Sequence, residues 1–306
     1  MGKDANKVDI YEEITNKIVS TLEGMDHDQW EAPFAQLAAQ GWPFNPTTNS
    51  HYQGVNVAAL WLGQQERGFR SNHWATFKQW KDHGACVRKG ERACRIIFFK
   101  TILKTQDSDN GEADIHVNVP VLRCYSVFNA DQVEGYDPSE VETEPTTNLV
   151  ERLEAVETFC ARTSADIRRS GSQAYYDRKG DFINIPNPDA FNDTSSATAT
   201  ENYYATLLHE LTHWTGAPHR LNRDKAQNPT DREKYAFEEL IAELGSAFLC
   251  AQLGITQTPR DDHAHYLKNW LQALKNDKKY IFQASAGAAR ACEYLFALQQ
   301  SENLRS

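Results

Sequence analysis

Two histidines and a glutamate stand in the order H-E-x-x-H within the segment TLLHELTHWTGAPHR, residues 206–220. In a helix, His209 and His213 lie one turn apart on the same face, where both imidazoles can bind one zinc ion. Glu210 lies beside them and can accept a proton from a water molecule that the metal activates near neutral pH. The sequence therefore predicts a metal site of the metallopeptidase kind in this segment.

The motif lies in a segment with the features of a capped amphipathic helix. Thr198 and Glu201 have the spacing of a capping box at its start, and Gly216 followed by Pro218 marks its end. Apolar side chains occupy the faces that the two histidines leave free: Tyr204, Leu207, Leu208 and Leu211. This context favours a real metal site over a chance match to five letters.

Catalytic zinc usually takes three protein ligands, and the next predicted helix offers acidic candidates. Glu239 and Glu243 stand one turn apart in FEELIAELGSAF, with the small residues Ala242 and Ser246 beside them. Small neighbours allow two helices to approach closely around an ion. Both acids could instead be solvated surface residues, which is the commonest environment of glutamate.

H-E-x-x-H followed by a glutamate on a later helix resembles the gluzincins, of which thermolysin is the familiar member. The resemblance implies that Glu239 is the third ligand and that Glu243 orients a ligating histidine from behind. The 26 residues from His213 to Glu239 exceed the thermolysin spacing, so the choice between the two acids stays open. Glu238 is a third candidate and the weakest, because Ala242 stands four residues after it. Zn²⁺, or another divalent ion such as Mn²⁺, is the expected cofactor.

A second stretch of the chain is strongly basic. Residues 67–104 hold ten Lys and Arg against two Asp and Glu, a net charge of +8 in a chain whose net charge is −10. Aromatic residues alternate with lysines within it. Single-stranded nucleic acid needs this combination, because unpaired bases stack on rings and phosphates pair with cations. The candidate contacts are Trp74, Phe77, Lys78, Trp80, Lys81, Arg88, Lys89 and Arg92.

The rings of this stretch have a second interpretation. Trp74, Phe77 and Trp80 follow the i, i+3, i+6 spacing of one helix face, and such stripes commonly pack in a core. We therefore expect at least one of the three rings to be buried.

The length and composition of the chain, together with its N-terminus, indicate the general class of the protein. The 306 residues suffice for two ordinary domains, and 40% of them are hydrophobic. The N-terminus, MGKDANKVDI, has no apolar core of a signal peptide, and no apolar run is long enough to span a bilayer. Six scattered cysteines favour reduced, mostly buried thiols. We expect a cytoplasmic protein with no membrane partner.

An acidic segment divides the chain into two units. Residues 129–148 contain six acidic residues, no basic ones and two prolines, a composition typical of a solvated linker. We place an N-terminal domain at 1–130, the linker at 131–148 and a C-terminal domain at 149–306. Because few contacts normally cross such a linker, we expect the two units to be separable.

Periodicity predicts the elements of each unit. In the N-terminal unit, isoleucines spaced by four predict a helix over 8–24, and β-branched runs predict strands over 93–104 and 119–129. In the C-terminal unit we expect a helix over 147–163, a strand near 181–186, the two capped helices and a helical region over 262–300. The second capped helix should begin after a capping box at Thr230 to Glu233 and end at Gly254. The fold class is α+β, with a mainly helical second domain.

The longer sequence runs carry a closer resemblance. The N-terminal unit contains, in order, W-E-A-P-F, G-W-P-F-N-P, H-Y-Q-G-V-N-V-A-A-L, W-A-T-F-K-Q-W and G-A-C-V-R-K-G-E. These runs resemble the N-terminal domain of plasmid antirestriction proteins of the ArdC type, which is also attached to some TraC-type primases. A-T-L-L-H-E-L-T-H-W-T-G with Y-A-F-E-E-L-I-A-E-L resembles the zincin-like domain that completes the ArdC type.

The resemblance implies that the N-terminal domain binds single-stranded DNA and that the protein protects plasmid DNA from host restriction during conjugation. We therefore expect an α+β single-stranded-DNA-binding domain joined by the acidic linker to a gluzincin-like metallopeptidase domain. Subunits of host restriction–modification enzymes, or other DNA-bound proteins, are the expected peptidase substrates. One alternative is a non-catalytic binding protein that keeps the zincin fold as a scaffold, although a scaffold has no need of Glu210. Another is a plain peptidase whose basic face binds acidic proteins.

Overall fold

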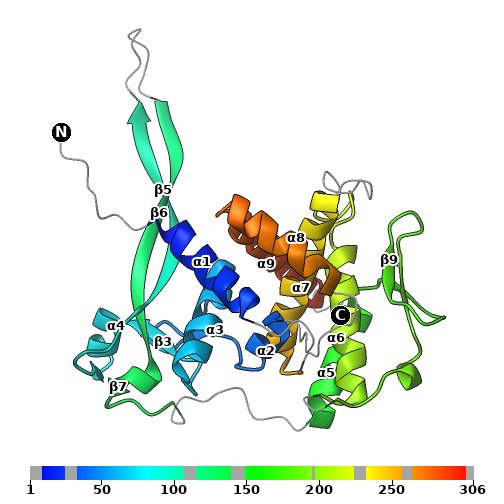
Figure 1. Ribbon diagram of the computed structural model, residues 1–306, viewed down its shortest axis with the longest axis horizontal. Helices are drawn as coiled ribbons and strands as arrows, with labels where there is room; N and C mark the ends of the chain where they lie inside the picture. The colour runs from blue at the N-terminus through cyan, green and yellow to red at the C-terminus, as the bar shows by residue number, and fades with distance from the viewer. Residues whose placement is uncertain are drawn as a thin grey trace.

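The computed structural model of the chain describes residues 9–24, 33–106, 115–138, 149–194, 197–223, 232–256 and 264–300. Helices and strands alternate in the first half, and helices dominate the second (Figure 1). This arrangement confirms the predicted α+β class with a mainly helical C-terminal domain. Among the described helices, none combines the length and the apolar character needed to cross a bilayer.

The N-terminal half contains four helices and seven strands within the described residues. The helices are α1 (Ile10–Glu23), α2 (Pro33–Ala38), α3 (Val55–Arg67) and α4 (Phe77–Asp82), with a 3-10 turn η2 (Ala130–Gln132). The strands are β1 (Phe44–Asn45), β2 (Ser50–His51), β3 (Trp74–Thr76), β4 (Cys86–Val87), β5 (Cys94–Gln106), β6 (Ile115–Asn129) and β7 (Val133–Glu134).

The predicted helix and both predicted strands of this half are confirmed. The side chain of Asp9 caps α1 by accepting a hydrogen bond from the backbone N of Tyr11 at 3.0 Å, and Ile10, Ile14 and Ile18 are buried. β5 and β6 pair in antiparallel register from Cys94 opposite Val127 onward and form a long hairpin that projects from the body (Figure 1). β3 adds to the other edge of β6, which gives the sheet order β3-β6-β5.

The C-terminal half is built on helices. They are α5 (Leu149–Arg162), α6 (Ala199–Trp214), α7 (Arg232–Leu253), α8 (Ala264–Asn276) and α9 (Tyr280–Gln300), with a 3-10 turn η4 (Pro188–Ala190). A small sheet of β8 (Asp166–Arg169), β10 (Phe182–Ile185) and β9 (Tyr175–Asp177), in that order, lies beside α6. β10 is parallel to β8 and antiparallel to β9.

The predicted start of α6 and the predicted end of α7 are both found in the structure. Thr198 accepts a hydrogen bond from the backbone N of Glu201 at 3.2 Å, and the Glu201 carboxylate accepts one from the backbone N of Thr198 at 3.0 Å. α7 ends at Leu253, and Gly254 adopts a left-handed φ of 68°. The proposed capping box at the start of α7 includes residue 230 and lies outside the described residues. The helical region predicted over 262–300 divides into α8 and α9.

The beginning of the acidic segment is folded, which corrects the start of the linker. η2 follows β6 directly, and β7 pairs with β4, with Val133 opposite Val87. Gln132 and Val133 are buried. The N-terminal unit therefore continues at least to Glu134, while residues 139–148 lie outside the described residues.

The two halves share one hydrophobic core. α1 packs on α8, and α2 packs on α7. The rings of Trp42 and Trp61 lie 5.4 and 5.8 Å from the ring of Phe248 in α7, measured between centroids. Our premise that few contacts cross the linker is therefore wrong, and a fragment that stopped in the linker would leave the faces of α1, α2 and α3 uncovered.

Candidate metal centre and nucleic-acid interface

α6 and α7 approach each other closely at two small residues. An added Cβ atom on Gly245 would lie 2.5 Å from Cγ2 of Thr212, so any larger residue there would separate the helices. The hydroxyl of the next residue, Ser246, donates a hydrogen bond to the backbone oxygen of Ala205 at 3.0 Å. The small residues expected beside the metal site, Ala242 and Ser246, are both fully buried between the helices.

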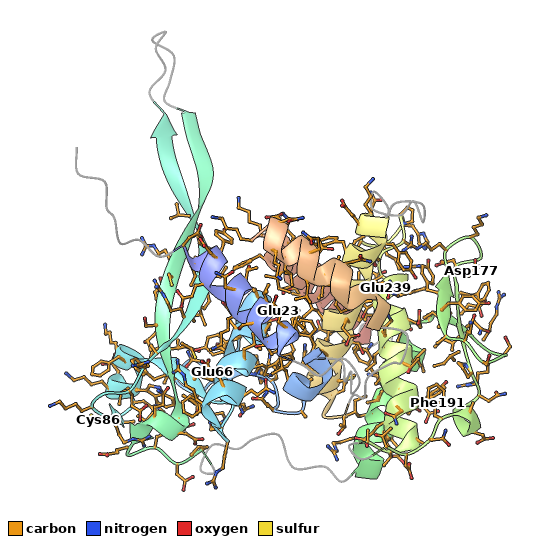
Figure 2. All side chains as sticks on the ribbon, in the orientation of Figure 1. Glu23, Glu66, Cys86, Asp177, Phe191 and Glu239 are labelled. Carbon is orange, nitrogen blue, oxygen red and sulfur yellow. The ribbon has the colours of Figure 1, made fainter. Side chains whose placement is uncertain are left out.

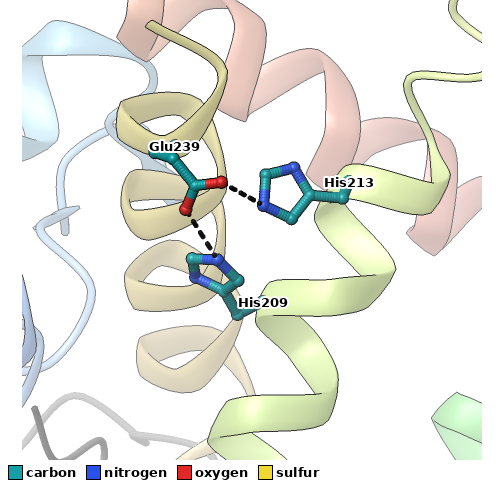
Figure 3. Close-up of side chains that lie close together, drawn as sticks. All are labelled: His209, His213 and Glu239. Carbon is teal, nitrogen blue, oxygen red and sulfur yellow. Dashed lines mark ion pairs between the residues drawn. The ribbon is translucent and has the colours of Figure 1, made fainter. Parts of the chain in front are cut away.

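This close packing brings three potential ligands together (Figure 3). Nε2 of His209 lies 3.6 Å from one carboxylate oxygen of Glu239, and Nε2 of His213 lies 3.4 Å from the other. The ligand atoms of the three residues all lie within 4.8 Å of one another. His209 and Glu239 are buried, and His213 is nearly so. Figure 2 shows Glu239 well inside the helical half of the molecule.

The opposite nitrogen of each imidazole faces an outer carboxylate. Nδ1 of His209 lies 3.7 Å from Glu243, and Nδ1 of His213 lies 3.3 Å from Glu238. The contact of His213 is a hydrogen bond, which directs its Nε2 toward the cluster as in metal-binding histidines, whereas that of His209 is a longer ion-pair contact. Glu239 is therefore the acid between the histidines, and Glu243 stands behind His209.

Glu238 has a position that the sequence did not indicate. Its carboxylate accepts two hydrogen bonds from Arg223, from Nε at 3.2 Å and from Nη2 at 2.9 Å. Arg223 also donates to the hydroxyl of Thr215 at 2.7 Å and to the backbone oxygen of Thr212 at 2.6 Å. This arginine thus joins the end of α6 to α7 behind His213. No spacing rule could have found it, because Arg223 lies in the irregular segment after α6.

The electrostatics of the cluster fit a divalent cation. Burial lowers the pKa of His213, but the charge of Glu239 and the hydrogen bonds to Glu238 and Glu239 outweigh it and raise that pKa to about 10. Burial raises the pKa of Glu239, but both histidines together hold it well below its ordinary value. Both shifts show that the cluster favours positive charge; without a metal that charge is the imidazolium proton, which a divalent cation would have to displace. Two imidazoles and one carboxylate are also the donor set of many catalytic zinc sites.

Glu210 lies on α6 between the two histidines in sequence and is buried. Its negative charge contributes to the raised pKa of His213, which places the carboxylate within electrostatic reach of the ligand cluster.

The aromatic residues expected to contact DNA divide into two groups. Trp74 and Trp80 have no exposed surface, so neither ring can stack on a base, and this part of the prediction is wrong. The physical reason is that the run is not one helix: Trp74 belongs to β3, and α4 begins only at Phe77, after a capping box at Thr76. Trp80 packs beneath α4, where its Nε1 donates to the backbone oxygen of Phe128 at 2.9 Å. Phe77 alone is exposed, to 54%.

The five basic candidates are all exposed: Lys78, Lys81, Arg88, Lys89 and Arg92. Arg88 is already engaged in an ion pair with Glu91 at 3.0 Å. Two further exposed rings lie outside the predicted set, Phe98 on β5 and Tyr125 on β6. The polar neighbours Arg123, Cys124 and Ser126 are the one signal in the sequence that this end of β6 faces solvent.

Comparison with known proteins covers both halves. The family model described as the N-terminal domain of anti-restriction factor ArdC matches residues 8–128, and a model described as a zincin-like metallopeptidase matches residues 154–287. The chain is 38% identical to protein y4eC of Sinorhizobium fredii over 97% of this chain and 94% of that protein. It is 33% identical to the DNA primase TraC of Escherichia coli, over 97% of this chain but 28% of the primase.

Two solved structures are similar over nearly the full length. The crystal structure of metal-free antirestriction protein ArdC from plasmid R388 matches with a TM-score of 0.77 and 37% identity, over 95% of this chain and 97% of that one. The Mn(II)-bound structure of the same protein matches with a TM-score of 0.72 and 36% identity, over 95% and 98% of the two chains.

Proposed function

Since this chain belongs to the ArdC family of antirestriction proteins, we propose that it protects incoming plasmid DNA from host restriction during conjugation. In this proposal the N-terminal half binds single-stranded DNA, and the C-terminal half acts as a metal-dependent peptidase. The combination is supported by the two family matches, one to the ArdC N-terminal domain and one to a zincin-like metallopeptidase, and by the full-length similarity to the ArdC structure. Host restriction–modification subunits, or other proteins bound to the same DNA, are the proposed substrates.

One observation carries the peptidase part: both Nε2 atoms of the motif converge on Glu239, while both Nδ1 atoms face outer acids. Such a cluster is suited to Zn²⁺ or Mn²⁺, and the Mn(II)-bound ArdC structure supports a divalent ion in this family. A bound ion would act as a Lewis acid and lower the pKa of water at the site.

The protein's own groups would handle the proton. Glu210 is proposed to take a proton from water and to return it to the amine that leaves when the peptide bond breaks. Glu238 and Glu243 would hold the histidines in one orientation.

The test is a cleavage assay on purified protein. The protein is stripped of metal, reloaded with Zn²⁺ or Mn²⁺, and incubated with restriction subunits in the presence and absence of single-stranded DNA. We expect cleavage by the wild type and none by the Glu210→Gln variant, with products identified by mass spectrometry. If Glu210→Gln still protects plasmid DNA fully in a conjugation assay, catalysis is not the protective activity and the non-catalytic scaffold is correct.

A further inference from the structure

A large cavity lies between the two halves of the molecule. Its volume is about 1570 Å³, and its walls come from α4, β5 and β6 on one side and α9 on the other, with the start of α3 between them. Sites for small molecules enclose roughly 300–1000 Å³. The cavity is therefore large enough for part of a polymer, and the metal ligands are not among the residues that line it.

Most of the exposed rings among the described residues line this cavity. Among the described residues, five large hydrophobic side chains are exposed, and three of them line it: Phe77 at 54%, Phe98 at 49% and Tyr125 at 39% exposed. The rings of Phe98 and Tyr125 contact each other edge to face, with 5.6 Å between centroids. Exposed rings gathered in a concave surface are typical of a binding site.

Cations stand on both walls. Lys78 follows Phe77 on α4, and Lys279 and Arg290 line the opposite side on or beside α9. Lys78 and Arg290 are exposed and form no ion pair with another described residue. Two acids, Asp82 and Glu293, also line the cavity, so its lining carries a small positive charge in a chain of −10.

The exposed face of α9 in the cavity carries three polar side chains and no large apolar one. Gln283, Ala286, Arg290 and Glu293 recur every three or four residues, so they lie along one side of the helix, and all four are exposed. The other side of α9, with Ala284, Ala288, Cys292 and Leu295, is buried in the shared core. α9 is therefore held firmly while it presents a cationic side chain to the cavity.

We propose that this cavity is the groove that binds single-stranded DNA, and that α9 of the C-terminal half forms one of its walls. The proposal rests on the proposed DNA binding of the N-terminal half and gives it a location. Unpaired bases would stack on Phe77, Phe98 and Tyr125, and phosphates would lie against the cations of the two walls. Duplex DNA offers these rings no free base face. DNA binding and the zincin-like domain then share a structural element.

Two exposed cysteines provide a test in the unaltered protein. Cys124 lines the cavity beside Tyr125, whereas Cys86 lies outside it, at the outer edge of the N-terminal half (Figure 2). Each thiol is labelled with a maleimide and quantified by mass spectrometry, with and without saturating 20-nucleotide oligo-dT. We expect the labelling of Cys124 to slow at least tenfold and that of Cys86 to stay unchanged. Undiminished labelling of Cys124 while the oligonucleotide is bound would overturn the groove.

Affinity measurements separate the groove from DNA binding as such. By fluorescence anisotropy with labelled oligo-dT, Phe98→Ala and Tyr125→Ala should each bind about tenfold more weakly, because one stacked base is lost. Arg290→Ala should reduce the slope of log K against log salt by about 0.7. Tyr175→Ala and Lys179→Ala are matched controls, because both residues are exposed in the distant β9–β10 region and should bind as wild type.

Each other result has a defined meaning. Wild-type protein that does not bind oligo-dT would overturn the proposed DNA binding itself. If the Phe98, Tyr125 and Arg290 variants bind oligo-dT normally while Lys89→Ala or Arg92→Ala binds it weakly, only the groove is overturned. The DNA would then bind the basic segment between β4 and β5. If an unfolded polypeptide slows the labelling of Cys124 and oligo-dT does not, the DNA groove is overturned and the cavity is a peptide site.

Discussion

Glu238 lies 3.3 Å from Nδ1 of His213 and joins the second histidine of the H-E-x-x-H motif to Arg223, which is outside the motif. The arginine side chain is 9% exposed and the glutamate 2%, so neither charge can be compensated by water. Removing one member of such a pair leaves a buried charge without its partner, which costs several kcal/mol. His213 therefore owes its orientation to a residue ten positions further along the chain.

We predict that Arg223→Ala weakens metal binding about 10- to 100-fold, as loss of outer partners of a metal ligand commonly does. The affinity is measured by competition with a chelator, which needs no enzymatic activity. Arg220→Ala is the matched control, because that arginine pairs instead with Asp181. Equal metal affinity in the Arg223 and Arg220 variants would show that the ion pair to Glu238 does not support His213.

We predict that His209→Ala, His213→Ala and Glu239→Ala each lose stoichiometric metal, because each removes one of three convergent donors. Glu243→Ala should keep a metal ion with reduced affinity, since Glu243 faces Nδ1 of His209 and not the centre of the cluster. Elemental analysis of the purified variants measures both. Metal retained by Glu239→Ala and lost by Glu243→Ala would reverse the assignment of the two acids.

Gly245→Ala should destabilise the protein although alanine normally favours a helix. The added Cβ would lie 2.5 Å from Cγ2 and 2.8 Å from Oγ1 of Thr212, which is fully buried. Overpacking of this kind costs roughly 1–3 kcal/mol, more than the helix propensity gained. Thermal unfolding measures the loss, and Thr212→Ala in the same chain should restore part of it. A Gly245→Ala variant as stable as the wild type would mean that α6 and α7 are not in close contact here.

Trp80→Ala should lose about 3–5 kcal/mol of stability, because it empties a buried site and leaves the backbone oxygen of Phe128 without its indole donor. Phe77→Ala, three residues earlier, should leave the melting temperature nearly unchanged, because that ring is half exposed. Denaturant unfolding of both variants tests the assignment. A stable Trp80→Ala variant that fails to bind oligo-dT would return this ring to the DNA-binding surface.

Acid stability should depend in part on Asp181. The hydrogen bond from Arg220 lowers the pKa of this carboxyl to about 2, against the opposing effect of partial burial. Because the folded pKa is the lower one, the contribution to stability is complete above the unfolded pKa of 3.8 and is lost as the pH falls toward 2. Asp181→Asn keeps a residue that tolerates the φ of 53° at this position. Urea unfolding between pH 2 and 5 should show a shallower pH dependence for this variant than for the wild type.

The sequence determined the features that depend on neighbours within one helix or strand. His209 and His213 share a face of α6 because they are four residues apart, and the cap at Thr198 fixes where that helix begins. The β-branched runs of β5 and β6 likewise formed strands. These properties follow from backbone geometry and from side chains a few positions apart, so they can be read without knowing the fold.

Tertiary structure alone decided which distant groups meet. Glu238, Glu239 and Glu243 lie on one helix, and only the close approach of α6 at Gly245 decides which of them stands between the histidines. The sequence could not decide which rings are exposed, because the burial of a ring depends on what packs against it. The tryptophans of β3 and α4 are buried, whereas Phe98 and Tyr125 face the cavity. The sequence also did not predict that the two halves share one core. The acidic composition describes the connecting segment and carries no information on the surfaces of the two units that it joins.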